Sequence, residues 1–459
     1  MFSREYKAVK TLSGVQNAVL SLSFSTGGLF LAAAGLDGLT VWDLRTLTQT
    51  LIPEKYNSPK DPNWKVSVLS WIFFEKGSRH VLLLGGMKGD LTAWHWNDTR
   101  RVFEHFARAS PNAATEQIMS IDVYHSQITS KRAATVAISC VDGSVAVWKL
   151  SSVGDFTLAF STVPDPNIMP KVVKFDKDRN LHVFAYTAGT LLCLDRTGKV
   201  KSSRNTGLDR IGAVAFDRYK DSVIVNNGKD FRVLSITNLT HQQTLPASAP
   251  TVVLYPKQVT FIEDGNKVVG GTDSGHAAIY DLSSGKIVQR LEYPKGGLVQ
   301  VVASITGDKQ SFIALAGSTV EQPADVLLFK RKHAPALLPS ISAPISRPTL
   351  HIMLAVLITM LSCHVYYIWT PHLLHSVSSF RDLASFARYM QFGQNVTFPP
   401  ATSPPAAGSS ETVTGNAQVA SHSTVMSSLH QKVPTPLQDC FRENPDSQLC
   451  SRDEIHLNA

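Results

Sequence analysis

The first two thirds of the chain repeat one hydrophobic pattern. Each copy has a short apolar run, a turn of small residues that contains Gly, and a second apolar run that ends in a large side chain. Short apolar runs broken by turn residues are typical of antiparallel strands. The clear copies are residues 30–44, 81–96, 135–150 and 267–282, and the weaker copies are 182–198, 222–237 and 311–331.

The spacing of the copies predicts how they assemble. The large residues that close them are Trp42, Trp94, Trp148, Leu194, Leu234, Tyr280 and Phe329. Neighbouring copies are 40 to 54 residues apart, close to the length of a four-stranded propeller blade with modest insertions. We therefore expect an all-β domain over residues 1–332, a seven-bladed β-propeller.

The ends of this region predict how the ring closes. The last copy supplies three strands, near residues 298–305, 311–317 and 325–330, and lacks a fourth. The N-terminal run YKAVKTL, residues 6–12, precedes the first strand of copy one and belongs to no blade of its own. We expect it to complete the seventh blade as its outermost strand, because a closed ring hides strand edges that would otherwise aggregate.

These copies resemble the WD-repeat β-propeller family. Trp42-Asp43 is a true WD dipeptide, and Trp148-Lys149 and Tyr280-Asp281 are degenerate forms of it. In that family a turn Asp, an upstream His, a Ser or Thr and the Trp form a buried hydrogen-bonded network. The resemblance implies that seven residues hold structural blade positions: Trp42, Asp43, Trp94, Asp142, Trp148, Tyr280 and Asp281.

Asp142 is the best match to the turn Asp of that network, since it stands six residues before Trp148. The upstream His is missing, because the segment KTLSGV has Val15 where the family has His. A buried carboxylate without a partner costs several kcal/mol. We therefore expect Asp142 to accept hydrogen bonds from turn amides instead.

A stretch without charge follows the repeats. Residues 350–369 contain no Asp, Glu, Lys or Arg, and a helix of that length is about 30 Å long, the thickness of a bilayer core. The stretch ends in Tyr366, Tyr367 and Trp369, which suit a membrane interface. The alternative is a helix buried in a globular domain, but the Pro-rich and polar flanks favour a transmembrane helix over residues 350–370.

The flanking charges predict the orientation of this helix. Lys330, Arg331, Lys332 and Arg347 precede it closely, whereas Arg381 and Arg388 are the nearest cations after it. Cations are enriched on the cytosolic side of a span. We expect a single-pass integral membrane protein with a cytosolic propeller, in the endoplasmic reticulum or another endomembrane.

The remaining segments are assigned from composition. Residues 333–349 are a Pro-rich linker, and residues 371–392 have helical apolar spacing that fits either an amphipathic helix on the membrane surface or a soluble helix. Residues 393–459 are expected to form a disordered lumenal or extracellular tail. There Asn395 would carry an N-glycan, and Cys440 and Cys450 would either form a disulfide or stay free thiols.

The composition excludes several functions. The net charge is +8, but Lys and Arg form no block of five or six, so we expect no nucleic-acid partner. Phosphate-loop, CxxC, HExxH and GxSxG motifs are missing from the sequence, so we expect no enzyme activity, cofactor or metal. His276 lies in a blade turn and is expected at the surface, whereas Cys140 and Cys193 are expected to be reduced core residues.

Two functions fit this layout. The first is a membrane-tethered scaffold whose cytosolic propeller binds a protein or peptide partner. The second is a guanine-nucleotide exchange factor for a small GTPase, because the endoplasmic-reticulum exchange factors that start COPII coats also have a WD-like propeller, one span and a lumenal tail. Those proteins use a loop that projects from the first blade, and residues 53–65 are the comparable insertion in this chain.

Overall fold

The computed structural model describes most of the repeat region and one short helix. The described residues are 5–52, 65–109, 116–129, 132–248, 251, 256–307, 309–333 and 355–364. Contacts divide the chain into two units, Met1–Ser346 and Arg347–Ala459. Each unit is considered by itself.

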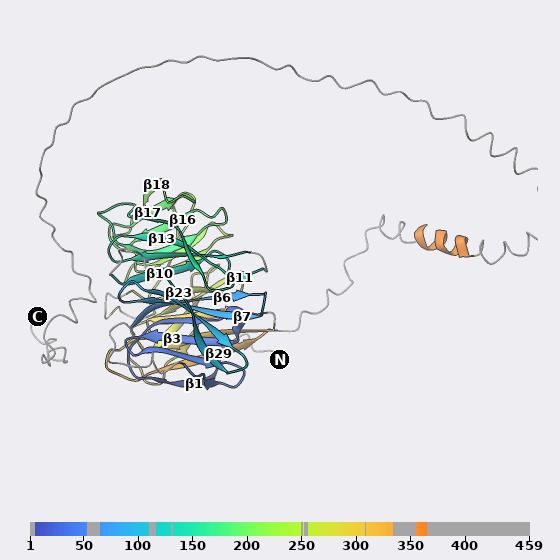
Figure 1. The fold of residues 1–459 in the computed structure, drawn as a ribbon, viewed down its shortest axis with the longest axis horizontal. Coiled ribbons are helices and arrows are strands. Elements are labelled where there is room, and N and C mark those ends of the chain that lie inside the picture. The colour runs from blue at the N-terminus through green and yellow to red at the C-terminus, as the bar shows by residue number, and fades with distance from the viewer. Residues whose placement is uncertain are drawn as a thin grey trace, which may run out of the picture. The chain divides into compact units, whose positions relative to one another are not determined.

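The first unit is a seven-bladed β-propeller, as the sequence predicted. Its described residues form seven sheets, which follow one another along the chain and pack face to face (Figure 1). The first strand of each blade contacts the first strand of the next, and the first strand of blade 7 contacts that of blade 1. The first strands therefore line the inside of a closed ring.

In blades 1 to 4 the strands follow chain order from the inner to the outer edge of the ring. Blade 1 contains β2 (Val19–Phe24), β3 (Phe30–Gly35), β4 (Gly38–Asp43) and β5 (Thr48–Gln49), with a 3₁₀ turn η1 (Thr26–Gly28) after β2. Blade 2 contains β6 (Val66–Phe74), β7 (Arg79–Gly86), β8 (Leu91–Asn97) and β9 (Val102–Ala109). Blade 3 contains β10 (Ile118–Val123), β12 (Ala134–Cys140), β13 (Val145–Leu150) and β14 (Phe156–Thr162). Blade 4 contains β15 (Pro170–Phe175), β16 (Leu181–Ala185), β17 (Thr190–Leu194) and β18 (Val200–Asn205).

Blades 5 to 7 follow the same order, except that the N-terminal strand completes the last one. Blade 5 contains β19 (Ala213–Asp217), β20 (Ser222–Asn226), β21 (Phe231–Leu234) and β22 (His241–Leu245). Blade 6 contains β23 (Val259–Ile262), β24 (Lys267–Gly271), β25 (His276–Asp281) and β26 (Ile287–Glu292). Blade 7 contains β27 (Val301–Thr306), β28 (Gln310–Ala316), β29 (Ala324–Lys332) and β1 (Lys7–Val15).

The pairing of β1 confirms the predicted ring closure. β1 runs antiparallel to β29, with a register that extends from Lys7 opposite Lys330 to Val15 opposite Ala324. Leu12 and Val15 of β1 are buried in the core between blades 7 and 1. The strand extends beyond the predicted run 6–12 as far as Val15, whose side chain is buried and which pairs with Ala324 of β29.

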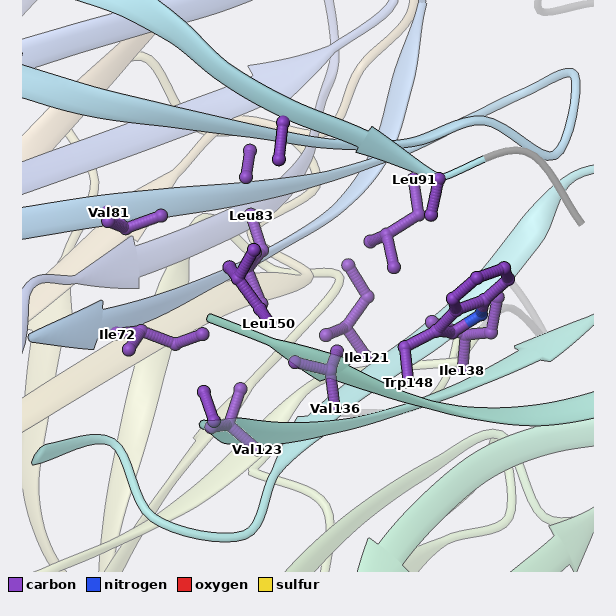
Figure 2. Packing of buried hydrophobic residues seen from close by; sticks show 14 of the residues in the cluster. Ile72, Val81, Leu83, Leu91, Ile121, Val123, Val136, Ile138, Trp148 and Leu150 are labelled. Atoms are coloured by element: carbon purple, nitrogen blue, oxygen red, sulfur yellow. The ribbon is translucent and has the colours of Figure 1, made fainter. Parts of the chain in front are cut away.

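The core lies between neighbouring blades. Figure 2 shows Ile72, Val81 and Leu83 of blade 2 and Val136 and Ile138 of blade 3, whose side chains belong to one buried cluster. β-Branched and leucine side chains on alternate strand positions suit this packing of one sheet against the next. Cys140 belongs to the same cluster as a free thiol, and burial raises its pKa to about 12.

The described part of the second unit is a helix over residues 355–364, inside the predicted span 350–370. Thr359 and Ser362 donate hydrogen bonds to the carbonyls of Ala355 and Ile358, four residues earlier. Within the described residues, no helix is both long enough and apolar enough to cross a membrane. The rest of the predicted span, residues 334–349 of the linker, the helix 371–392, and the tail with Asn395, Cys440 and Cys450 lie outside the described residues.

Candidate partner-binding surface

The strand order gives the ring two faces with different loops. In each blade the strands alternate in direction, so the loop after the first strand and the loop after the third strand emerge on one side, which we name face A. The loops between second and third strands and the loops between blades emerge on the other side, named face B. Lys332, at the end of β29, and Lys7, at the start of β1, both lie on face A.

The large residues that close the repeats lie in the core. Trp42 is 2% exposed, and Trp94, Trp148 and Tyr280 are also buried, all on third strands. The hydroxyl of Tyr280 donates a hydrogen bond to the carbonyl of Pro246 at 2.9 Å. Burial raises the pKa of this phenol to about 12. These aromatic residues therefore pack blades together and leave binding to other positions.

The two WD-type aspartates organise turns on face A. Asp43 is buried and forms ion pairs with Arg45 at 3.0 Å and Arg101 at 3.4 Å, which join blade 1 to blade 2. Burial would raise the pKa of Asp43, but the hydrogen bonds and charge of Arg45, together with the charge of Arg101, outweigh it, so this pKa lies below its usual value. Asp281 accepts hydrogen bonds from Ser283 and Ser284 in the turn that follows β25.

Asp142 is exposed and accepts a hydrogen bond from the amide of Ser144 at 2.9 Å. It therefore stabilises a turn on face B and is not part of a buried network. The Asp142 carboxylate is accessible to water. It therefore does not need the histidine that WD repeats place beside their turn Asp.

A buried histidine network does occur, but in blade 6. His276 is 6% exposed, so the expectation that it lies at the surface was wrong. Its Nε2 lies 2.7 Å from the hydroxyl of Ser248, and its Nδ1 lies 3.0 Å from the carbonyl of Ser274. The sequence pattern missed this network because the histidine stands at the start of the third strand and the hydroxyl precedes the first.

A buried ion pair lies beside this network on face B. Lys257 Nζ is 2.9 Å from Asp273 Oδ2, and the two side chains are 6% and 2% exposed. Lys257 also donates to the carbonyl of Gly228 at 3.0 Å, and Gln300 Nε2 donates to Asp273 Oδ1 at 3.1 Å. These contacts connect blades 5, 6 and 7. The adjoining pocket has a volume of about 20 Å³, which is room for roughly one water molecule. Within the described residues, we therefore assign this cluster a structural role in holding the three blades together.

Face A has one strand that lies outside the blade pattern. The loop after β10 forms β11 (Gln127–Ile128), which pairs in parallel with β6, the innermost strand of blade 2. The amides of Phe73 and Glu75 donate to the carbonyls of Ser126 and Ile128 at 2.7 and 3.0 Å. Thr26 of blade 1 donates to the carbonyl of Ser126 at 3.3 Å. Residues 124–129, which we name the plug segment, therefore bridge blades 3, 2 and 1 at the inner edge of the ring.

The other side of the plug segment gathers arginine and aromatic side chains. The Cζ atoms of Arg179 and Arg218 lie 5.0 and 5.3 Å from the centre of the Tyr124 ring, and the His125 ring lies 4.2 Å from it. The Tyr124 hydroxyl donates to the carbonyl of Lys177 at 2.9 Å. Cation–π contacts and this hydrogen bond hold the cluster at the junction of blades 3, 4 and 5.

Two guanidinium groups lie over this ring, one of them paired with a buried acid. Asp122 is the nearby buried acid, and its carboxylate is shared by Lys174 at 3.1 Å and Arg218 at 3.8 Å. Burial lowers the pKa of His125, and the charges of Arg218, Arg179 and Arg132 lower it further. The imidazole is therefore neutral at pH 7, and the positive charge over the Tyr124 ring comes from guanidinium groups.

Tyr219 follows Arg218 directly and is 77% exposed. Exposed tyrosine beside arginine is the composition that marks the energetic centres of protein interfaces. We name Tyr124, His125, Arg132, Arg179, Arg218 and Tyr219 the arginine surface. Sequence analysis did not single out these residues, since they come from the turns after the first strands of three different blades.

No protein-family model matches the chain, and no curated protein matches it significantly.

Proposed function

We propose that this chain is a scaffold whose propeller binds a protein partner through the arginine surface on face A. A β-propeller suits such a role because its loops present a broad surface on a rigid ring. The observation that carries the proposal is the exposure of Tyr219 next in sequence to Arg218, whose guanidinium group converges with that of Arg179 on the ring of Tyr124. The proposal assigns no chemical step to the chain.

Site-specific photo-crosslinking tests this surface. Benzoylphenylalanine at Tyr219 in the full chain, expressed in cells, is expected to give a discrete adduct with a partner protein, because this position lies within the proposed contact. The matched control is benzoylphenylalanine at Val288, which is 49% exposed on β26, the outer strand of blade 6. Adducts of equal yield at both positions, or none at Tyr219, would reject the proposed binding surface.

The wider proposal is that the scaffold is tethered to a membrane by residues 350–370, with the propeller in the cytosol. The support is the uncharged stretch and the cations that precede it. Protease added to intact microsomes should digest the propeller and spare a tail fragment that carries one N-glycan on Asn395. A glycan on Asn97 or Asn238, which are sequon residues of the propeller, would reverse the orientation.

The alternative function for a propeller followed by a membrane span is nucleotide exchange on a small GTPase. The insertion that would serve it, residues 53–65, lies outside the described residues except for Lys65. Release of a fluorescent GDP analogue from a panel of small GTPases by the full-length protein would support exchange, and release at the intrinsic rate would dismiss it.

A further inference from the structure

We propose that the arginine surface recognises a phosphorylated segment of the partner protein. This inference rests on the proposed function and names the chemistry of the bound segment. Three features of the surface carry it: the pairing of each arginine, the position of the nearby acids and the shape of the charged area.

Two arginines of the surface have charges that no described acid neutralises. Arg179 is exposed, and among the described residues no carboxylate lies within ion-pair distance of it; its guanidinium is oriented by the Tyr124 ring at 5.0 Å. Arg132 is exposed as well and forms no ion pair with a described acid. A guanidinium that is already oriented loses less freedom when it binds a doubly charged anion through two hydrogen bonds.

Two acids near the surface, Asp176 and Asp122, have carboxylates that are already bound within the protein. Asp176 accepts hydrogen bonds from the amides of Asp178 and Asn180 and lies 3.4 Å from His182. Asp122 is occupied by Lys174 and Arg218. An incoming anion therefore meets the guanidinium groups and the neutral imidazole of His125, with Asp178 as the exposed acid beside Arg179 in the chain.

The shape of the charged area favours a peptide over a membrane or a nucleic acid. The guanidinium groups of Arg179 and Arg218 converge on the ring of Tyr124, whereas binding to a lipid surface or to nucleic acid needs many cations over a broad area. Acidic residues in the same turns limit the area of positive charge. They are Asp178 after β15, Asp217 at the end of β19 and Asp221 after it. Tyr219 supplies apolar contact area for the residues that flank a single phosphate.

The arrangement therefore has the parts of a phosphopeptide site. Arg179 would bind the phosphate oxygens, and Arg132, whose charge lowers the pKa of His125, would add to the attraction. Arg218 would keep Tyr124 and Asp122 in place while contributing charge. Arg218 is a positioning residue in this scheme, because it already contacts the carbonyl of Val123 at 3.1 Å and the carboxylate of Asp122.

A peptide-library experiment tests the inference with the full-length protein in detergent. The probes are three immobilised libraries with a fixed central phosphoserine, serine or glutamate and four degenerate positions on each side. We expect at least about tenfold more retention of protein by the phosphoserine library than by the serine library, because charge-assisted hydrogen bonds to phosphate are strong. Equal retention by the phosphoserine and serine libraries would overturn the inference.

Matched variants assign the retention to the surface. The double variant Arg132→Gln/Arg179→Gln should fall to the retention of the serine library, and both positions are exposed, so its melting temperature should stay unchanged. The control is Arg290→Gln, an exposed arginine on β26, which should bind like the wild type. Equal losses in the control and the double variant would show nonspecific attraction and refute the site.

Two further measurements separate this inference from its alternatives. Binding of phosphatidylserine vesicles or of a single-stranded oligonucleotide, with the same dependence on Arg132 and Arg179, would reject a peptide as the ligand. If phosphatase treatment leaves the Tyr219 cross-link intact and the phosphoserine library is not retained, the scaffold proposal stands and the phosphopeptide inference fails. If Tyr219 gives no cross-link at all, both fail.

Discussion

Deletion of residues 1–12 is expected to destabilise the propeller by about 5 kcal/mol or more. The deletion removes the buried side chains of Tyr6 and Leu12, each worth roughly 1.5–3 kcal/mol. It also leaves the backbone groups of β29 that pair with Lys7 to Leu12 without partners. Thermal unfolding followed by circular dichroism measures the loss.

Two comparisons show that the effect comes from the closing strand. Deletion of residues 1–4, which precede β1, should leave the unfolding midpoint unchanged. Leu12→Ala should cost about 2–5 kcal/mol, whereas Lys10→Ala, at an exposed position of the same strand, should stay within about 0.5 kcal/mol. A deletion of residues 1–12 that melts like the full chain would mean that β1 does not hold the ring together.

Replacement of Lys257 by Met is expected to cost about 3–5 kcal/mol, because it leaves the Asp273 carboxylate buried without its cation. Gln300 remains as a donor to Asp273 Oδ1, but a neutral amide does not compensate the charge. Urea unfolding, analysed by linear extrapolation, measures the difference in free energy of unfolding between the variant and the wild type.

A second substitution distinguishes the charge from the packing. Asp273→Asn in the Lys257→Met background removes the buried negative charge and should recover at least half of the lost stability. Exposed Lys229→Met, on the neighbouring turn of blade 5, should be nearly neutral. If the double variant is no more stable than Lys257→Met alone, loss of the Lys257 side-chain contacts, and not the buried charge of Asp273, explains the effect.

The fold could be predicted from the sequence because each blade carries its own signal. Apolar runs and glycine turns recur at nearly constant spacing, and the run 6–12 had no partner within its own copy. The pairing of β1 with β29 followed from this shortage of one strand. Even copies without a Trp, such as the one closed by Leu234, formed complete blades, because burial of apolar strand faces does not require the WD dipeptide.

The family pattern was a weaker guide to individual polar residues. Asp142 occupies the expected place in its turn but faces solvent, and His276 is buried where exposure was expected. Spacing along the chain fixes which turn a residue occupies. The direction of its side chain depends on neighbouring blades, which the pattern within one copy does not contain.

The arginine surface could not be predicted from the pattern within one copy for a similar reason. Tyr124, Arg179 and Arg218 are separated by 55 and 39 residues, and they meet because successive blades place the turns after their first strands at the same radius. Alignment of the copies by their first strands would have shown a basic residue in this turn in blades 4 and 5. β11 could not be found in this way, since its two residues are too few to show alternation.

The position of the ring closure determines how the propeller responds to mechanical load. Lys7 and Lys330 face each other at one end of the β1–β29 ladder, so a pull between residue 5 and residue 333 opens this ladder from that end, one hydrogen bond after another. A pull on residue 333 against the other blades instead loads β29 along its length, in shear against both β28 and β1. Ladder hydrogen bonds perpendicular to the strands resist shear together and resist peeling singly. The ring therefore withstands tension through its C-terminal strand far better than tension between its two ends.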